Sequence, residues 1–197
     1  MLLAGLTGNY GMGKSTVLHI FEKLGAVTRD SDEIVGSLFE EEDVIRRIRH
    51  ILGDRVFYKS GRLNKKKVAR IIFRDDTLRR SLEDIVHPLV FERVRTLADG
   101  LKGTEKVVIV EVPLLFERGY QDRFDRTITV YTEEDVALYR LGKRGIKVKE
   151  AAARLSSQLP IKEKMKRADF VIDNNGTTRK TAEQVHMIYE RLSESRK

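Results

Sequence analysis

The sequence lacks cysteine and tryptophan and contains three prolines. Without cysteine, neither a disulfide nor a thiolate metal site can form, which fits the reducing cytoplasm. The longest apolar run, Val107–Val112, is interrupted by Glu111 and is too short to cross a bilayer as a helix. No basic segment precedes the first apolar residues, so we expect no signal peptide. These absences predict a cytoplasmic protein without a membrane span.

Charged residues, in contrast, are plentiful. The 197 residues are 41% hydrophobic and 35% charged, which is typical of a soluble domain with its own core, and the formal net charge of +8 favours acidic partners. Aromatic residues do not alternate with basic ones as a base-stacking surface requires, so we expect small polyanions as partners and no nucleic acid. The pattern makes no prediction about oligomeric state. Most basic clusters are interpreted as solvated helix faces: Arg46–Arg49, Lys65–Lys67, Arg79–Arg80, Arg140–Arg144 and Lys162–Arg167.

A glycine-rich loop stands near the start of the chain. The residues Gly8–Ser15 read GNYGMGKS and match the phosphate-loop pattern GxxxxGK[ST]. Apolar residues at Leu2–Leu6 predict a strand before the loop, and apolar residues recur at helical spacing through Val17–Leu24 behind it. Strand, loop and helix in this order are the context that the pattern requires, which makes an ordinary glycine turn a poor alternative. We predict a nucleoside triphosphate site.

The residue types of this loop suit phosphate chemistry. Glycines let backbone N–H groups approach phosphate oxygens, and the helix behind the loop adds its unpaired N-terminal donors. Lys14 is expected to reach the β- and γ-phosphates, and the Ser15 hydroxyl to complete the shell of a Mg²⁺ ion. The predicted nucleotide contacts in the loop are Gly8, Asn9, Tyr10, Gly11, Met12, Gly13, Lys14, Ser15 and Thr16.

Two acids follow a second short predicted strand, Gly25–Thr28. In an open α/β sheet the carboxyl end of such a strand lies beside the ligand. We predict that one of Asp30 and Asp32 takes the proton of an acceptor hydroxyl and that the other helps to position Mg²⁺ through water. The alternative is that Asp30 or Ser31 caps the following helix, and both roles are compatible.

Residues 41–103 are highly charged and show helical periodicity. Their four apolar stripes are separated by Gly53, Gly61 and the pair His87–Pro88, where one helix is expected to stop and the next to begin. A run of helices before the next strand predicts a region inserted into a nucleotide-binding core. We expect this region to hold the second substrate.

Three further strands are predicted, at Val107–Val112, Arg126–Tyr131 and Asp169–Ile172. The first is apolar almost throughout, as in a central parallel strand that is buried on both faces. Glu111 near its end occupies a position where phosphate-loop proteins carry a metal-binding acid, although a single acid after an apolar strand is common.

A basic segment follows the strand at Arg126–Tyr131. It carries Arg140 and Arg144, and an amphipathic stretch, Val148–Leu159, comes after it. Arginine can offer two donors to a transferring phosphoryl group, so we predict a lid that closes over the triphosphate and excludes water. A surface helix with ordinary basic residues is the alternative.

Together these motifs resemble those of the dephospho-CoA kinase family, over nearly the whole chain. The segment Val112–Glu117, which reads VPLLFE, and the ending Ala168–Asn174 are more specific for this family than the phosphate loop is. The matching pieces are Gly5–Thr16, Asp30–Asp32, His87–Pro88, Val112–Glu117, Arg140–Leu141 with Arg144, Gln158 and Ala168–Asn174.

The resemblance implies an α/β fold of the phosphate-loop kinase type in three layers, with a parallel five-stranded sheet, an inserted helical substrate-binding region and a helical lid. It implies a nucleotide-binding core at residues 1–40, 104–139 and 168–197, a helical CoA-substrate region at 41–103 and a lid at 140–167. The implied reaction transfers the γ-phosphoryl group of ATP, with Mg²⁺, to the ribose 3′-hydroxyl of dephospho-CoA, which is the last step of coenzyme A biosynthesis.

The resemblance also implies roles for single residues. Asp32 matches the general base, Arg140 the arginine on the triphosphate with Arg144 as a second candidate, and Asn174 the loop beside the adenine. His87, next to Pro88, is an acceptor-binding candidate whose alternative is to end a helix. The full set is Asp32, Lys14 and Arg140 for catalysis; Arg140, Arg144 and Asn174 with the loop for ATP; Asp32, His87, Pro113, Leu114 and Leu115 for the acceptor; and Ser15 and Asp30 for the metal.

The chain departs from the family pattern at three places. Ser31 replaces alanine between the two acids, Glu111 replaces aspartate before VPLL, and Asn9–Tyr10 replaces a smaller pair in the loop. None of these changes removes a chemical group that the reaction needs.

Three other functions share some of these features. Another phosphate-loop kinase, acting on a nucleoside or a nucleoside monophosphate, needs the same loop, acids and lid, and Val112–Glu117 is the segment that argues against it. A GTPase switch would need an Asn-Lys-x-Asp guanine motif, which the sequence lacks. An ATPase that binds nucleic acid would show salt-dependent stimulation by DNA or RNA.

Overall fold

The computed structural model describes residues 1–72 and 74–194, and the chain divides into two compact units. The sheet unit comprises Met1–Asp30 and the chain from Gly100 onwards, and the helical unit comprises Ser31–Asp99. The helical unit therefore begins before residue 41, where the sequence analysis starts the inserted region. Among the described helices, none combines the length and the apolar character that crossing a membrane requires.

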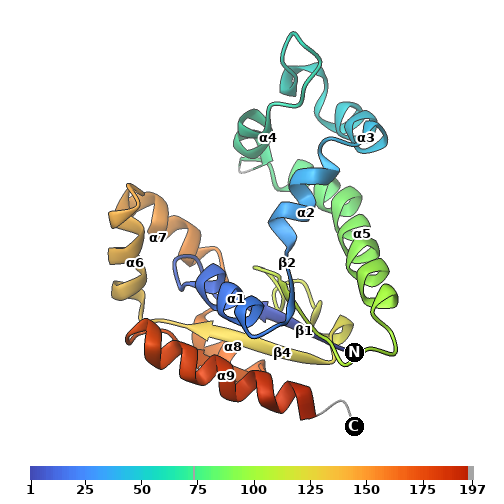
Figure 1. Cartoon of the computed structure of the whole chain (residues 1–197). Helices are drawn as coiled ribbons and strands as arrows, with labels where there is room; N and C mark the ends of the chain where they lie inside the picture. The colour runs from blue at the N-terminus through green and yellow to red at the C-terminus, as the bar shows by residue number, and fades with distance from the viewer. Residues whose placement is uncertain (73, 195–197) are drawn as a thin grey trace. The chain divides into compact units, whose positions relative to one another are not determined.

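The sheet unit is built on a parallel five-stranded sheet, as predicted, with the strand order β2-β3-β1-β4-β5. Figure 1 labels three of these strands, β1, β2 and β4. β3 is buried along its whole length, as expected for a strand between two parallel neighbours. β2 lies further along the chain than predicted, because Gly25 takes a φ of 97° in the turn that follows the first helix. The strands are β1 Leu2–Thr7, β2 Val27–Asp30, β3 Val107–Glu111, β4 Arg126–Tyr131 and β5 Phe170–Asp173.

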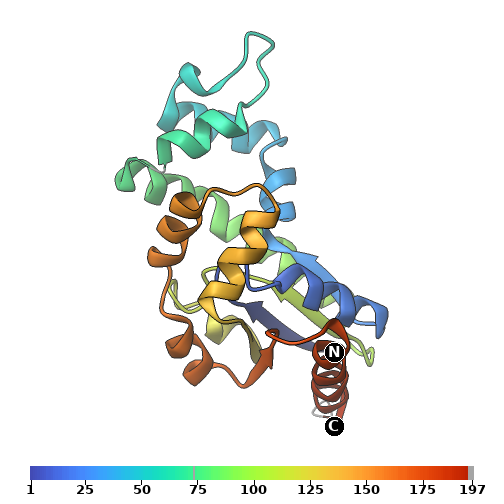
Figure 2. The same ribbon diagram turned by 90° about the vertical axis from the view of Figure 1, so that its left-hand side faces the viewer.

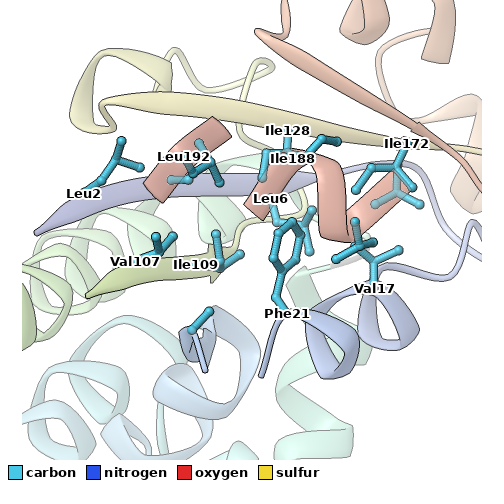
Figure 3. Packing of buried hydrophobic residues seen from close by; sticks show 14 residues of the cluster. Leu2, Leu6, Val17, Phe21, Val107, Ile109, Ile128, Ile172, Ile188 and Leu192 are labelled. Carbon is cyan, nitrogen blue, oxygen red and sulfur yellow. The ribbon is translucent and has the colours of Figure 1, made fainter. Parts of the chain in front are cut away.

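Helices cover both faces of this sheet and complete the three predicted layers. On one face, Val17 and Phe21 of α1 and Leu192 of α9 pack against the strands (Figure 3). Full burial of side chains of this size contributes roughly 1.5–3 kcal/mol each. On the other face, the Thr129 hydroxyl of β4 donates to the Lys164 carbonyl of α8. The helices of the sheet unit are α1 Lys14–Lys23, α6 Glu134–Lys143, α7 Val148–Ser156, α8 Ile161–Arg167 and α9 Thr178–Glu194, with α6 and α7 side by side in Figures 1 and 2.

The helical unit has a hydrophobic core of its own, to which every one of its long helices contributes. These helices are α2 Ser31–Leu38, α3 Glu42–Leu52, α4 Lys65–Ile72 and α5 Asp76–Gly100. Short 3₁₀ turns lie at Asp54–Val56 in this unit and at Gln121–Arg123 in the sheet unit.

The predicted helix break at His87–Pro88 is wrong, because α5 continues through Pro88. Proline removes one backbone N–H and crowds the carbonyl of the residue four positions earlier, here Asp84, at a cost of about 3 kcal/mol. Asp84 and Pro88 are both exposed, so that carbonyl is free to bond water. The buried stripe that continues on both sides of the proline offsets the cost: Leu82, Val86, Val90, Val94 and Ala98.

Candidate functional site

The phosphate loop joins β1 to α1, in the context that the sequence predicted. Gly13 stands at the N-cap of α1 with a φ of 88°, and a Cβ there would collide with the side-chain amide of Asn174. A Cβ at Gly8 would lie 2.5 Å from the Val130 carbonyl oxygen. The Val130 carbonyl of β4 thus requires glycine at position 8, and the Asn174 side chain, which follows β5, requires glycine at position 13. Because a helix leaves its first N–H groups without intrahelical partners, the start of α1 offers donors for a phosphate.

Side chains that follow two strands bind the phosphate loop near its C-terminal end, at Met12. The Met12 carbonyl accepts a hydrogen bond of 3.2 Å from the Thr132 hydroxyl and one of 2.9 Å from the Asn174 amide. Thr132 follows β4 and Asn174 follows β5. Thr132 is not among the predicted site residues, since a lone threonine after a strand belongs to no sequence motif.

The chain between α7 and α8 holds the middle of the loop. The Tyr10 N–H donates to the Gln158 side-chain oxygen at 2.8 Å, and the Asn9 side-chain amide donates to the Leu159 carbonyl at 3.1 Å. The Arg154 guanidinium of α7 lies 4.9 Å from the centre of the Tyr10 ring, within the range of a cation–π interaction. The predicted lid segment is therefore in direct contact with the phosphate loop.

One cation and two carboxylates lie at the carboxyl edge of the sheet. The Lys14 ammonium is 3.6 Å from a carboxylate oxygen of Glu111, and both side chains are largely buried. Asp30 is the register partner of Glu111 across β2 and β3. Ser15 lies exposed in the first turn of α1. Hydroxyl and carboxylate oxygens are ligands of the kind that Mg²⁺ takes, together with phosphate oxygens.

No group of three or more metal-ligating His, Asp or Glu side chains occurs among residues 1–72 and 74–194. Mg²⁺ does not need a dedicated all-protein cage, because it is usually held by one or two protein groups, by water and by the phosphates of a bound nucleotide. The donor set of Ser15 with Asp30 and Glu111 fits this way of binding Mg²⁺.

A cavity of about 380 Å³ opens beside the loop. Arg140 of α6 donates to the Asn174 backbone carbonyl at 2.9 Å, which anchors the guanidinium at the rim. Arg144 stands at the C-terminal end of the same helix. The structure thus brings the predicted triphosphate and adenine residues together around one opening. The lining residues are Gly11, Gly13, Thr16, Arg140, Leu141, Lys143, Arg144, Asn174, Gly176 and Thr178.

The predicted acceptor segment leaves β3 next to the phosphate loop. The Val112 N–H donates to the Leu6 carbonyl at 2.8 Å, and the Thr7 hydroxyl donates to the Pro113 carbonyl at 3.2 Å. Pro113 and Leu114 are half-buried, whereas Leu115 is fully buried. Of the three predicted acceptor contacts in this segment, Leu115 is a core residue, because its side chain packs under the sheet beside Gly5.

The two remaining predicted residues belong to the helical unit. Asp32 lies in the first turn of α2, where a carboxylate interacts favourably with the helix dipole. His87 lies inside α5, so the alternative that it ends a helix is wrong. The residues that line the cavity beside the loop all belong to the sheet unit. The role of Asp32 as general base and the role of His87 as an acceptor contact stay predictions.

Comparisons with known proteins agree with this geometry. The family model described as dephospho-CoA kinase matches residues 2–180. The dephospho-CoA kinase of Aquifex aeolicus (strain VF5) is 36% identical over 190 residues, with 96% of each chain covered. That of Geobacillus kaustophilus (strain HTA426) is 37% identical over 187 residues, with 93% of each covered.

Solved structures show the same fold. TT1252 from Thermus thermophilus has a TM-score of 0.86 at 30% identity, covering 96% of both chains. Dephospho-CoA kinase from Campylobacter jejuni has a TM-score of 0.71 at 26% identity, covering 99% of this chain and 98% of that one. Shikimate kinase from Acinetobacter baumannii, at 17% identity and a TM-score of 0.54, shares the fold. Phosphate loop, sheet order, VPLLFE segment and relatives all lead to one conclusion: the chain belongs to the dephospho-CoA kinase family.

Proposed function

We propose that the chain transfers the γ-phosphoryl group of ATP to the 3′-hydroxyl of the ribose of dephospho-CoA, giving CoA and ADP. The observation that carries this proposal is the direct attachment of the VPLLFE segment to the phosphate loop. Thr7, which immediately precedes the loop, bonds to the Pro113 carbonyl of that segment. A donor nucleotide in the loop and an acceptor against Pro113 and Leu114 would then be neighbours.

ATP is proposed to bind with its phosphates in the loop and its base in the adjoining cavity. Backbone N–H groups at the start of α1 and the Lys14 ammonium would bind the phosphate oxygens. Arg140 and Arg144 line the cavity, from which guanidinium groups can reach a triphosphate. Asn174, which is 7% exposed and fixed by its own hydrogen bonds, would form the wall beside the adenine.

Mg²⁺ is part of this proposal, with the Ser15 hydroxyl as a direct ligand and Asp30 acting through water. The ion would neutralise charge on the β- and γ-phosphate oxygens. Ser15 and Asp30 come from α1 and from the end of β2, so the protein offers few ligands and the nucleotide would supply the rest.

The chemical step is proposed to be an in-line displacement. The acceptor 3′-oxygen forms the new bond to the γ-phosphorus, the bond from that phosphorus to the β–γ bridging oxygen breaks, and ADP leaves with the electron pair. Asp32 would accept the hydroxyl proton. Lys14 and Arg140 would stabilise the charge on the transferring phosphoryl oxygens.

A kinase acting on a nucleoside or a nucleoside monophosphate is the alternative with the same architecture, and the family match favours dephospho-CoA over it. A substrate panel tests the choice: purified protein with ATP and Mg²⁺ is offered dephospho-CoA, adenosine, AMP and shikimate, and ADP formation is measured. We expect turnover with dephospho-CoA. Turnover with another acceptor and none with dephospho-CoA would overturn the proposal. A cytoplasmic location, with ATP and dephospho-CoA as partners and no nucleic acid, belongs to the same proposal.

A further inference from the structure

Lys164 of α8 is fully buried, with a side-chain exposure of 0%. Solvated helix faces are the interpretation for most of the basic clusters, and in Lys162–Arg167 the exposed basic residues are Lys162, Lys166 and Arg167. Lys164 does not fit that interpretation. Lysine is almost never fully buried unless its charge is paired. A buried lysine cannot increase solubility as an exposed lysine does, so the position of Lys164 has to be explained by the groups that its ammonium binds.

Two oxygens of the segment Pro113–Glu117, which contains predicted contacts to the acceptor substrate, bind this ammonium. The Lys164 Nζ donates to the Pro113 carbonyl at 3.2 Å and lies 2.8 Å from a carboxylate oxygen of Glu117. Pro113 and Glu117 are the two ends of a short turn after β3, so one cation fixes both ends of it. Leu114, between them, is the half-exposed residue that the proposed function sets against the acceptor.

The same contacts continue to the phosphate loop along two routes. On one route, the Pro113 carbonyl also accepts the Thr7 hydroxyl, and Thr7 directly precedes the loop. On the other, the Glu117 carboxylate accepts the Leu159 N–H at 3.0 Å, while the Leu159 carbonyl accepts the Asn9 side-chain amide. Lys164 is thus the junction between the segment proposed to bind the acceptor and the loop proposed to bind the donor.

We propose that Lys164 is a positioning residue for phosphoryl transfer. It holds the Pro113–Glu117 segment in a fixed position relative to the phosphate loop. This inference rests on the proposed function. In the proposed function Lys164 contacts neither ATP nor dephospho-CoA, and it acts through the Pro113 carbonyl and the Glu117 carboxylate. Alignment of acceptor oxygen and phosphorus is demanding, since a misplacement of about 1 Å can cost about 10²-fold in rate.

The charges around Lys164 are few and opposed. Glu117 faces it from the segment after β3, and Lys14 faces it from the phosphate loop. Burial lowers the pKa of Lys164, Glu117 raises it, and Lys14 lowers it. The Glu117 carboxylate therefore opposes the lowering of the Lys164 pKa by burial and by Lys14.

A paired substitution separates positioning from folding. In Lys164→Met with Glu117→Gln, uncharged side chains replace both charges, and the glutamine oxygen can still accept the Leu159 N–H. Removal of both charges of a buried pair is often neutral for stability. We expect a melting temperature close to that of the wild type and an affinity for a non-hydrolysable ATP analogue within threefold. We expect kcat/KM for dephospho-CoA to fall by at least about tenfold. Lys166→Met, which removes an exposed lysine of the same helix, is the matched control and should leave all three quantities unchanged.

Wild-type kcat/KM in the paired variant would overturn the inference, and so would a loss matched by an equal loss of affinity for the ATP analogue. Both outcomes leave the proposed function intact as long as the wild type phosphorylates dephospho-CoA. A wild type without that activity would overturn the proposed function and, with it, the role of Lys164.

Glu117→Gln tests the same role should the paired variant not fold. The amide keeps an oxygen for the Leu159 N–H but removes the charge that raises the pKa of Lys164. We expect the alkaline limb of the kcat/KM profile for dephospho-CoA to move to lower pH, while Lys166→Met keeps the wild-type limb. A profile of Glu117→Gln that overlays the wild type would contradict the inference.

Discussion

The side-chain amide of Asn174, after the last strand, donates to the backbone carbonyl of Met12 in the phosphate loop at 2.9 Å. The Asn174 side-chain oxygen accepts the Thr181 hydroxyl of α9 at 2.9 Å, and its backbone N–H donates to the Tyr131 carbonyl. One buried residue thus joins the loop, β4 and the last helix. This amide fixes the end of the loop from which α1 begins.

Asn174→Ala is expected to lower stability and weaken nucleotide binding together. The substitution leaves the Met12 carbonyl with the Thr132 hydroxyl as its remaining partner, and loss of one such hydrogen bond costs about 0.5–1.5 kcal/mol. Urea denaturation and the KM for ATP measure the two effects. Thr181→Val, which removes the other bond of the same side chain, serves as the control and should raise the KM for ATP much less. Equal effects of both variants on KM would refute this reading of Asn174.

Gly13→Ala and Gly142→Ala are expected to have opposite effects. A Cβ at Gly13 meets Asn174 and requires a φ of 88°, so alanine should destabilise by more than about 1 kcal/mol and abolish tight ATP binding. A Cβ at Gly142, inside α6, meets open space, and alanine there should stabilise by up to about 1 kcal/mol. Thermal melts with and without an ATP analogue compare the two. A stable Gly13→Ala protein with normal ATP affinity would show that the loop has another conformation.

Lys14→Met should lower kcat by about 10²–10³-fold, because it removes the charge that is proposed to stabilise the transferring phosphoryl group. Lys23→Met, at the exposed other end of the same helix, is the control and should keep wild-type kcat. Steady-state kinetics with saturating ATP and dephospho-CoA give the numbers. A kcat within twofold of the wild type would remove Lys14 from the mechanism.

Asp32→Asn should lower kcat by about 10²–10⁴-fold, the contribution typical of a general base, with ATP affinity unchanged. Glu33→Gln alters the neighbouring acid in the same first helical turn and should be close to the wild type. Single-turnover measurements isolate the chemical step from product release. Near-normal transfer by Asp32→Asn would disprove its assignment as the base.

Lys164 should make stability depend on pH in a defined direction. Because its pKa in the folded protein is lowered from 10.5, the unfolded chain binds the proton more tightly. Between the lowered pKa and 10.5 the unfolded state holds more protons, so the contribution of Lys164 to the free energy of unfolding rises with pH. The difference in that free energy between wild type and Lys164→Met, from urea titrations across this window, should increase. A difference that stays flat or falls would exclude the lowered pKa.

Local patterns were enough to predict the parts of the structure that depend on neighbours in sequence. The observed bounds of β4, Arg126–Tyr131, confirm the predicted ones, and the phosphate loop lies between strand and helix as its spacing required. Gly8 and Gly13 could be predicted as loop residues because the glycines of the phosphate-loop pattern indicate a backbone geometry that other residues rarely adopt.

Tertiary contacts determine the features that the sequence analysis missed. Pro88 predicts a helix end by its local preference. The helix continues because the packing of the buried stripe on both sides of Pro88 outweighs that preference. Lys164 and Thr132 each have partners far away along the chain, and a single lysine or threonine gives no sign of them. The role of Gln158 was likewise not predictable from its residue type, because the Tyr10 N–H that it binds lies 148 positions earlier.

The helical unit interrupts the chain between β2 and β3, which are hydrogen-bonded neighbours in the sheet. For the sheet, the whole unit is therefore part of one long connection, which runs from the carboxyl end of β2 to the amino end of the parallel strand β3. The entropy of closing a loop rises only with the logarithm of its length, by about 0.6 kcal/mol for each doubling. Lengthening, shortening or replacing this insertion thus costs the sheet little stability, so the nucleotide-binding half can stay constant while the inserted half changes its content.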